Sequence, residues 1–247
     1  MKMTIGLQLY TVRSEIGLGY DEILKRVAEI GYKCVEMTYD PSSGEEVGKL
    51  LAKYSLFATG AHVGIGEIEN NFETVLKFIK DIGAKAITVP GIDGIDTEEK
   101  TIATAKRLEA AAQKIIAAGY EAGFHNHTAE FAKKYGDRTV MDIFREEAPS
   151  LKFQIDVGWA FAAGVDVNAE LNRIGADRLA STIHIKDVDD NKTPTEIGSG
   201  NVCWPCVIET ANKLGVKYGI VEQDTCINYP PFESVKVSCD YLKTIND

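Results

Sequence analysis

The stretch NFETVLKFIKDIGAKAITVP, residues 71–90, contains the junction that decides the fold. Residues 71–83 have the apolar periodicity of an amphipathic helix and end on Gly83. Residues 85–90 form a short apolar run that is too short for a buried helix and is typical of a strand. Because glycine readily adopts the left-handed conformation that ends a helix, the stretch predicts a helix, a turn and a strand.

The same junction recurs along the chain, in EIG-YKCVE (29–36), AAG-YEAGF (117–124) and ANKLG-VKYGIV (211–221). Helical patterns also cover residues 20–31 and 101–119. Strands are predicted at residues 5–10, 34–39, 56–63, 85–90, 120–127, 151–157, 181–188 and 217–223.

Eight predicted strands alternating with helices indicate an α/β fold, a single (β/α)8 TIM barrel, with residues 1–247 as one domain. The alternative is an open, doubly wound sheet. No GxGxxG follows the first strand, which weakens the dinucleotide-binding form of that alternative.

The composition of the chain indicates which kinds of molecule it binds. The net charge is −10, and no Lys/Arg cluster interrupts it, so we expect neither nucleic acid nor an anionic membrane surface as a partner. No run of 18 apolar residues occurs, and the N-terminal segment becomes polar too early for a signal peptide. The five cysteines are irregularly spaced. We therefore expect a cytoplasmic protein with reduced cysteines that acts on a small molecule.

Polar side chains occur where the predicted strands end, which is where barrel enzymes carry their chemistry. Asp156, His184 and Glu222 hold equivalent positions on three neighbouring strands, so we expect them to converge. An imidazole with carboxylates suits one divalent metal ion, and the pattern does not distinguish among Mn, Zn, Fe, Mg and Co. The full set of strand-end polar residues is Gln8, Tyr10, Glu36, His62, His125, His127, Asp156, His184, Lys186, Glu222 and Asp224.

Several segments, in order along the chain, resemble one family. GLQLYTVR, HNHTAEF, DVGWAFAAGVD, IHIKDV, GSGNVCWP and VEQD are similar to those of the sugar phosphate isomerase/epimerase group of the xylose isomerase-like TIM barrel superfamily. The resemblance implies one divalent metal held at the barrel mouth by residues at the ends of strands five to eight. It assigns Asp156, His184 and Glu222 as ligands directly.

The strand-five ligand is ambiguous, because His125 stands where the family's epimerases have a glutamate. Either His125 is the ligand or Glu130 reaches back from the following loop, and we favour Glu130. His127 would then act as acid or base while His125 contacts substrate. Trp159 occupies the position of a histidine in those epimerases, which puts epimerisation by two glutamates in doubt.

The resemblance implies an isomerase or epimerase acting on a sugar, sugar phosphate or related polyol through an enediolate. A dehydratase of a keto-inositol or keto-sugar, an AP-endonuclease-like enzyme and a non-catalytic sugar-binding barrel are alternatives. The oligomeric state stays open, a homo-oligomer included. The candidate catalytic residues are His127, Glu222 and Lys186; the substrate-binding ones are Gln8, Glu36, His62, His125 and Trp159; the metal ligands are Glu130, Asp156, His184 and Glu222.

Two further motifs have weaker interpretations. Cys203 and Cys206 resemble a redox dithiol, but the pair follows a GSG turn late in the barrel pattern, and we expect no functional disulfide there. The backbone amides of residues 198–200 either bind a phosphate or form an ordinary turn.

Overall fold

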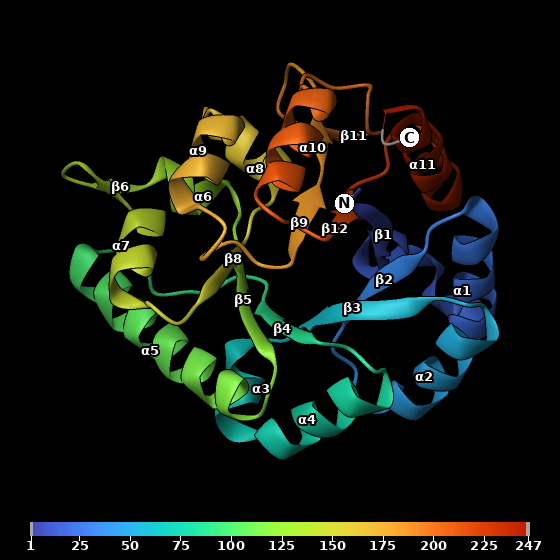
Figure 1. Ribbon diagram of the computed structural model, residues 1–247, viewed down its shortest axis with the longest axis horizontal. Helices are drawn as coiled ribbons and strands as arrows, with labels where there is room; N and C mark the ends of the chain where they lie inside the picture. The colour runs from blue at the N-terminus through green and yellow to red at the C-terminus, as the bar shows by residue number, and fades with distance from the viewer. Residues whose placement is uncertain (1, 246–247) are drawn as a thin grey trace.

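The computed structural model describes residues 2–245, and Figure 1 shows their strands gathered at the centre of the molecule inside a surrounding layer of helices. Within that range one sheet has eight strands in the order β8-β5-β4-β3-β2-β1-β12-β9. The strands are β1 (Thr4–Gln8), β2 (Cys34–Thr38), β3 (Phe57–His62), β4 (Ala86–Val89), β5 (Glu121–His125), β8 (Lys152–Gln154), β9 (Thr182–Ile185) and β12 (Tyr218–Val221).

The two end strands of this order, β8 and β9, meet and nearly close the barrel. Isolated parallel bridges join Phe153 to Leu179 and Asp156 to His184. Every strand pair of the sheet is parallel. The predicted (β/α)8 TIM barrel is therefore confirmed, and the open doubly wound sheet is excluded.

The helices lie in the connections between strands. The glycines predicted to end helices, Gly31, Gly83, Gly119 and Gly215, all have positive φ. The helical segments are η1 (Leu9–Leu18), α1 (Gly19–Ile30), α2 (Gly44–Lys53), α3 (Ile65–Asn70), α4 (Phe72–Asp81), α5 (Glu98–Ala117), α6 (Thr128–Ala132), α7 (Val140–Glu147), α8 (Val157–Ala162), α9 (Val167–Ile174), α10 (Trp204–Lys213) and α11 (Pro231–Ile245).

Two short hairpins lie outside the barrel sheet in the described residues. They are β6 (Lys134–Tyr135) with β7 (Arg138–Thr139), and β10 (Asp187–Val188) with β11 (Pro194–Thr195). The second hairpin begins at Asp187, just after β9 ends at Ile185.

Several strands end earlier than the sequence predicts, because side chains at their carboxyl ends bond to the next segment. The Gln8 side chain accepts the amide of Tyr10 and starts η1. Asp156 accepts the amide of Trp159 and caps α8, so β8 stops at Gln154. These bonds use one oxygen of each side chain and fix its direction at the barrel mouth.

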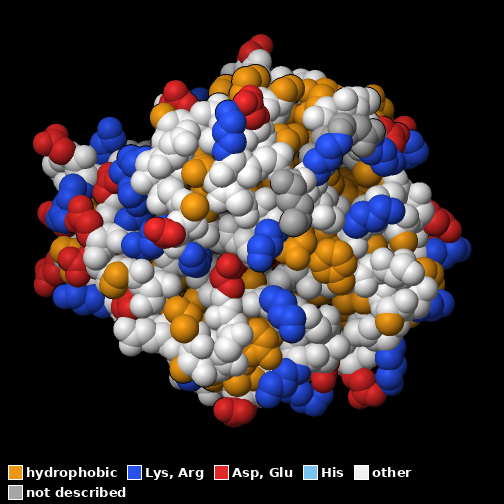
Figure 2. Space-filling view, viewed as in Figure 1, with side chains coloured by type: hydrophobic (Ala, Val, Ile, Leu, Met, Phe, Trp, Pro, Cys, Tyr) orange, Lys and Arg blue, Asp and Glu red, His pale blue; other side chains and the backbone are white. Residues whose placement is uncertain are grey.

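The hydrophobic core fills the space between the barrel and the helices. Fully buried residues such as Phe124 of β5 and Phe144 of α7 meet edge to face, with ring centroids 5.1 Å apart. On the outside, Figure 2 shows acidic and basic side chains interspersed over the face in view. No helix within residues 2–245 is both long enough and apolar enough to cross a membrane.

Cys203 and Cys206 are joined by a disulfide at the start of α10. The expectation that the cysteines are all reduced is therefore wrong for this pair. A separation of three residues at a helix N-terminus holds the two Cα atoms 5.4 Å apart, within the ordinary range for a disulfide. Cys34, Cys226 and Cys239 are free in the described part of the chain.

Replacing both Cys203 and Cys206 with serine is expected to leave activity close to that of the unmodified protein. The bond closes a loop of only a few residues, so its loss should lower the free energy of unfolding by at most about 2 kcal/mol. Chemical denaturation together with turnover measures both effects. A loss of activity greater than about tenfold in a folded variant would instead indicate a redox role.

Candidate active site

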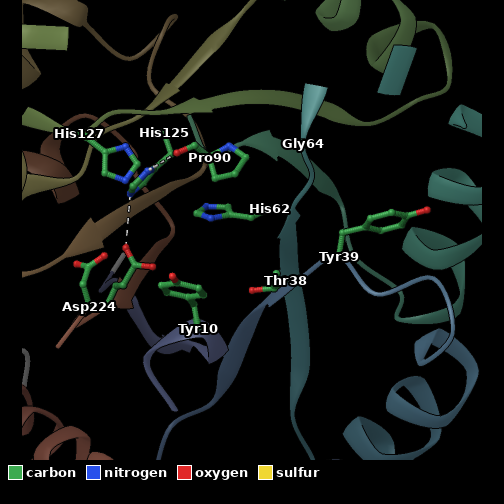
Figure 3. A pocket seen from close by; sticks show the side chains of 10 residues that line it. Tyr10, Thr38, Tyr39, His62, Gly64, Pro90, His125, His127 and Asp224 are labelled. Atoms are coloured by element: carbon green, nitrogen blue, oxygen red, sulfur yellow. Dashed lines mark hydrogen bonds and ion pairs between the residues drawn. The ribbon is translucent and has the colours of Figure 1, made fainter. Parts of the chain in front are cut away.

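The register of the barrel strands aligns the polar residues at their carboxyl ends, at the barrel mouth. Gln8 of β1 lies opposite Glu36 of β2, and His125 of β5 lies opposite Gln154 of β8. A cavity of about 390 Å³ opens above them (Figure 3). It is lined by Tyr10, Thr38, Tyr39, His62, Gly64, Pro90, His125, His127, Glu222 and Asp224.

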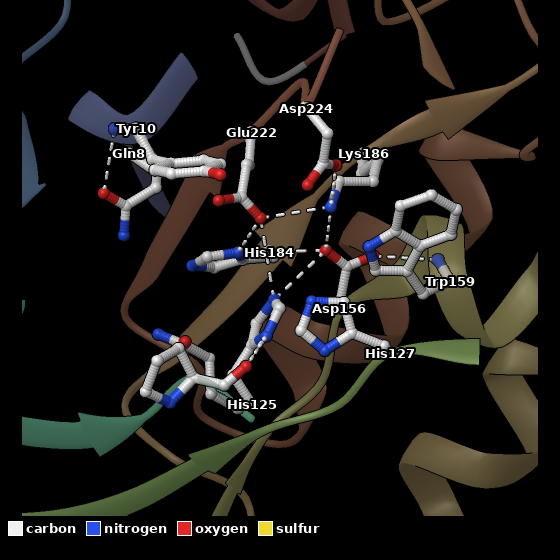
Figure 4. Close-up of polar contacts among 12 residues, drawn as sticks. Gln8, Tyr10, His125, His127, Asp156, Trp159, His184, Lys186, Glu222 and Asp224 are labelled. Atoms are coloured by element: carbon white, nitrogen blue, oxygen red, sulfur yellow. Dashed lines mark hydrogen bonds and ion pairs between the residues drawn. The ribbon is translucent and has the colours of Figure 1, made fainter. Parts of the chain in front are cut away.

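Four buried side chains at this mouth form a compact donor group, consisting of His125, Asp156, His184 and Glu222, with one ligand atom from each within 4.8 Å of all the others. Nε2 of His125 lies 3.3 Å from Asp156 Oδ2 and 3.6 Å from Glu222 Oε2. Nδ1 of His184 lies 3.0 Å from Glu222 Oε2 and 3.8 Å from Asp156 Oδ2. Figure 4 shows these side chains converging from different strands.

Each imidazole of the donor group has its second nitrogen anchored. Nδ1 of His125 lies 3.4 Å from the carbonyl oxygen of Pro90, which only accepts. Nε2 of His184 lies 2.6 Å from Glu36 Oε2. If these two nitrogens carry the protons, the lone pairs of His125 Nε2 and His184 Nδ1 face the carboxylates. This arrangement is the usual one for histidines that bind a metal.

Glu36 lies at the centre of a second, deeper layer. Its oxygens lie 2.8 Å from Gln8 Nε2 and 2.7 Å from Gln154 Nε2. The same carboxylate lies 3.1 Å from His62 Nε2. Glu36, His62 and His184 form a second possible metal-binding group. The carboxylate already accepts from donors on several strands, however, so a supporting hydrogen-bond network fits this layer better than a metal.

Lys186 is fully buried between three carboxylates. Its Nζ lies 2.9 Å from Asp156 Oδ2 and 3.1 Å from Glu222 Oε2. The third partner is Asp224, at 2.6 Å. The ammonium group also lies 4.6 Å from the centre of the Trp159 ring. Lys186 therefore offsets part of the negative charge that the donor group concentrates.

The charges of this cluster shift the pKa values of its members. Burial alone would raise the pKa of Asp156, but Lys186 and the two histidines lower it to about 2. Burial and the neighbouring His184 lower the pKa of His125 to about 3, so His125 is neutral at pH 7. Burial opposes charge on His184, yet Glu222 and Glu36 raise the pKa of His184 to about 10. A metal at Nδ1 of His184 must therefore displace a proton.

Glu130 lies outside the donor group. Its carboxylate accepts the backbone N–H of His127 at 2.8 Å and forms a capping box at the start of α6. The structure thus places His125, rather than Glu130, beside Asp156 and Glu222. The physical reason is local: as the third residue of α6, Glu130 satisfies a backbone donor that would otherwise be unpaired.

His127 and Trp159 lie together at the edge of the cavity. Their ring centroids are 6.4 Å apart, and His127 also contacts the His125 ring at 5.0 Å. In the capping box of α6, one nitrogen of the His127 imidazole accepts the backbone N–H of Glu130. The buried indole N–H of Trp159 has no partner within residues 2–245. The other ring nitrogen of His127 and this indole N–H can therefore bond to a ligand.

Sequence reasoning missed three supporting residues, because nothing in their local sequence marks them. Asn126 accepts the backbone N–H of Asp156 at 2.9 Å and so holds that loop in place. Gln154 bridges Glu36 and His62. Asp187 accepts the amides of Gly198 and Gly200, together with the Trp204 indole N–H. These two glycine amides are therefore already paired, which favours the ordinary turn over a phosphate site.

The fold and the site together define a parallel barrel with a buried group of imidazoles and carboxylates at its mouth, able to hold a metal. The sequence profile of the family described as xylose isomerase-like TIM barrel matches residues 24–245, and the chain belongs to this family. A search of curated protein sequences found no match.

Solved structures resemble the chain over nearly its whole length. A sugar phosphate isomerase/epimerase from Parabacteroides distasonis has 21% identity and a TM-score of 0.85, with 98% of each chain covered. The probable 3-DHS dehydratase from Bacillus anthracis has 11% identity and a TM-score of 0.81, covering 98% of this chain and 99% of that one. A 3-keto-D-glucoside 4-epimerase from E. coli has 18% identity and a TM-score of 0.75, covering 98% and 100%. At these identities the likeness establishes the fold.

Proposed function

We propose that this chain, as one barrel domain, is a divalent-metal-dependent isomerase or epimerase acting on a sugar or related polyol. The observation that carries the proposal is the pair of imidazoles, His125 and His184, each anchored at one nitrogen and facing two buried carboxylates with the other. The names of the similar structures, which include sugar phosphate isomerase/epimerase and 3-keto-D-glucoside 4-epimerase, support the substrate class.

The ligands that we propose are His125, Asp156, His184 and Glu222. Two nitrogen and two carboxylate donors suit Mn, Zn, Fe or Co better than Mg, which prefers oxygen ligands. His125 replaces Glu130 in the set favoured from the sequence, because Glu130 caps α6. A bound metal supplies Lewis acidity, which makes the C–H next to a substrate carbonyl more acidic.

Proton transfer is assigned to His127. Its imidazole lines the cavity and is half-buried, and the capping box of α6 uses only one of its two ring nitrogens. It can therefore take a proton from a substrate carbon and return it to the neighbouring carbon on the same face, as isomerisation requires. Epimerisation requires a second acid on the opposite face of the same carbon. Glu222 also lines the cavity and is a second candidate base.

The remaining candidates are given supporting or binding roles. The charges of Asp156, Glu222 and Asp224 raise the pKa of Lys186 against the opposing effect of burial, so Lys186 stays cationic and holds carboxylates rather than moving protons. Gln8 and Glu36 are fully buried and bonded to each other, which suits positioning of His184. His62 and the indole N–H of Trp159 remain as substrate contacts.

Metal analysis and isotope exchange test the proposal together. Protein purified without chelators is expected to contain about one equivalent of a divalent metal, since one donor group is proposed as its site. With metal, it should exchange a substrate C–H proton with deuterated water, and chelator treatment should abolish the exchange. A metal-free protein that binds sugars without exchange would instead be a non-catalytic barrel.

The Glu36→Gln substitution tests whether Glu36 positions His184 for metal binding. The glutamine lacks the charge that fixes the Nε2–H of His184, so affinity for a divalent metal is expected to fall by about 10–100-fold. Competition with a chromogenic chelator measures the affinity. Glu121→Gln is the matched control: Glu121 is a half-buried glutamate at the opposite end of β5 that accepts from Ser181. Unchanged affinity in Glu36→Gln would show that His184 is positioned without it.

Dehydration of a keto-sugar or keto-inositol is the second candidate reaction. The imidazole of His125 at the end of β5, and the likeness in fold to a probable 3-DHS dehydratase, favour it. Removal of the same C–H proton begins both reactions. A dehydratase would go on to release water and form a conjugated product, which ultraviolet absorbance detects and which an isomerase does not make.

A further inference from the structure

A second cavity, of about 280 Å³, lies beside the first between η1, α1 and β2. Aliphatic and aromatic side chains dominate its lining, and no carboxylate of the described residues contributes to it. Val12, Ile23 and Met37 are almost fully buried and form its inner surface. The lining also includes Leu9, Ile16 and Tyr20.

The two cavities adjoin each other. Tyr10 and Thr38 line both of them. Figure 3 shows these two side chains on the opposite side of the pocket from His125 and His127. A ligand that places its reacting carbon near His127 can therefore extend past Tyr10 into the second cavity.

Large apolar side chains are exposed at this cavity. Ile16 is 55% exposed and Tyr10 is 42% exposed. A single exposed isoleucine is ordinary on a protein surface. Here, however, the exposed groups continue into a buried apolar surface that opens beside a polar site, which is typical of ligand pockets.

Arg13 lines the second cavity and helps to hold its shape. The guanidinium donates from Nη1 to the carbonyl of Tyr10 at 2.8 Å and from Nη2 to the carbonyl of Asp224 at 2.7 Å. It also lies 3.9 Å from the centre of the Tyr10 ring. These contacts tie η1 to the segment after β12 and use two of the N–H donors of Arg13. The amides of Gly198 and Gly200 are already paired with Asp187 and do not favour a phosphate.

We infer that the second cavity is a subsite for an apolar substituent of the substrate, an aryl or short alkyl group carried by the sugar or polyol. The inference rests on the proposed function of the adjoining site for the sugar part alone. A volume of about 280 Å³ accommodates one aromatic ring, since a cavity of roughly 150 Å³ is known to bind benzene. The substrate class is thus a sugar derivative that carries an apolar group.

Benzyl alcohol probes the subsite without any sugar. An NMR titration of the full chain is expected to show binding that Ile16→Asp weakens at least about tenfold, because a carboxylate replaces apolar surface. Ile116→Asp is the matched control: Ile116 is 48% exposed on α5, away from the cavity, and its replacement should leave binding unchanged. Ile16 is itself largely exposed, so its replacement should not prevent folding. Equal binding by the two variants would overturn the subsite.

Phenyl and methyl β-D-glucoside then connect the subsite to the metal-loaded site. The unmodified protein is expected to bind the phenyl compound at least about tenfold more tightly, and Ile16→Asp should bring the ratio close to one. Benzyl alcohol binding without binding of either glucoside counts against the proposed sugar site and leaves the subsite standing. Failure of benzyl alcohol to bind, with a dimer that Ile16→Asp dissociates, would make this face an interface between copies and overturn the inference.

Discussion

Replacing His125 with asparagine is expected to lower affinity for a divalent metal by more than about 100-fold. Loss of a ligand should exceed the 10–100-fold effect of removing a supporting partner. Nε2 of His125 lies within 3.6 Å of both Asp156 and Glu222, and its other nitrogen is held by Pro90. Asparagine is shorter and cannot present a nitrogen lone pair at the same point.

Glu130→Gln tests the alternative in which Glu130, and not His125, is the metal ligand. Glu130 accepts the backbone N–H of His127, so the substitution weakens the cap of α6 but should leave metal affinity within about threefold. Metal content by elemental analysis and affinity by chelator competition measure both variants, with thermal melts to confirm folding. If Glu130→Gln loses the metal and His125→Asn keeps it, the two assignments are reversed.

Replacing His127 with asparagine is expected to keep the metal and reduce turnover by about 10²–10⁴-fold. That range is what a positioned general acid or base contributes. The His127 ring lines the cavity beside His125 and Trp159, and it lies outside the donor group. Asparagine preserves a polar side chain but cannot exchange a proton near neutral pH.

The measurement is proton exchange between a substrate carbon and solvent, followed by NMR in deuterated water at equal metal loading. Lys133→Gln, a change at a half-buried lysine immediately after α6, is the control for general effects on that helix. Wild-type exchange in His127→Asn would move the role of base to Glu222. Loss of the metal in the same variant would instead make His127 part of the metal site.

Local sequence signals were sufficient for the architecture. The glycine at the end of each helical pattern, such as Gly83 before β4, predicted where the chain turns back to the sheet. Short apolar runs predicted the barrel strands, because a strand buried on both faces needs apolar residues throughout. The matched positions of Asp156, His184 and Glu222 at strand ends also followed from this pattern, since parallel strands present their carboxyl ends at one mouth.

Only the tertiary structure decided which polar side chains at the strand ends join the donor group and which bond to the backbone or to each other. The sequence places His125 and Glu130 five residues apart, and the resemblance to the family favoured Glu130 as the ligand. The fold instead directs Glu130 to the backbone of α6 and His125 to the carboxylates. Gln154 and Asn126 act on residues that are distant in sequence, and the amides of residues 198 and 200 bond to Asp187 rather than face a ligand. Periodicity reports only which face of an element is buried; hydrogen bonds between elements depend on register, which exists only once the barrel has closed.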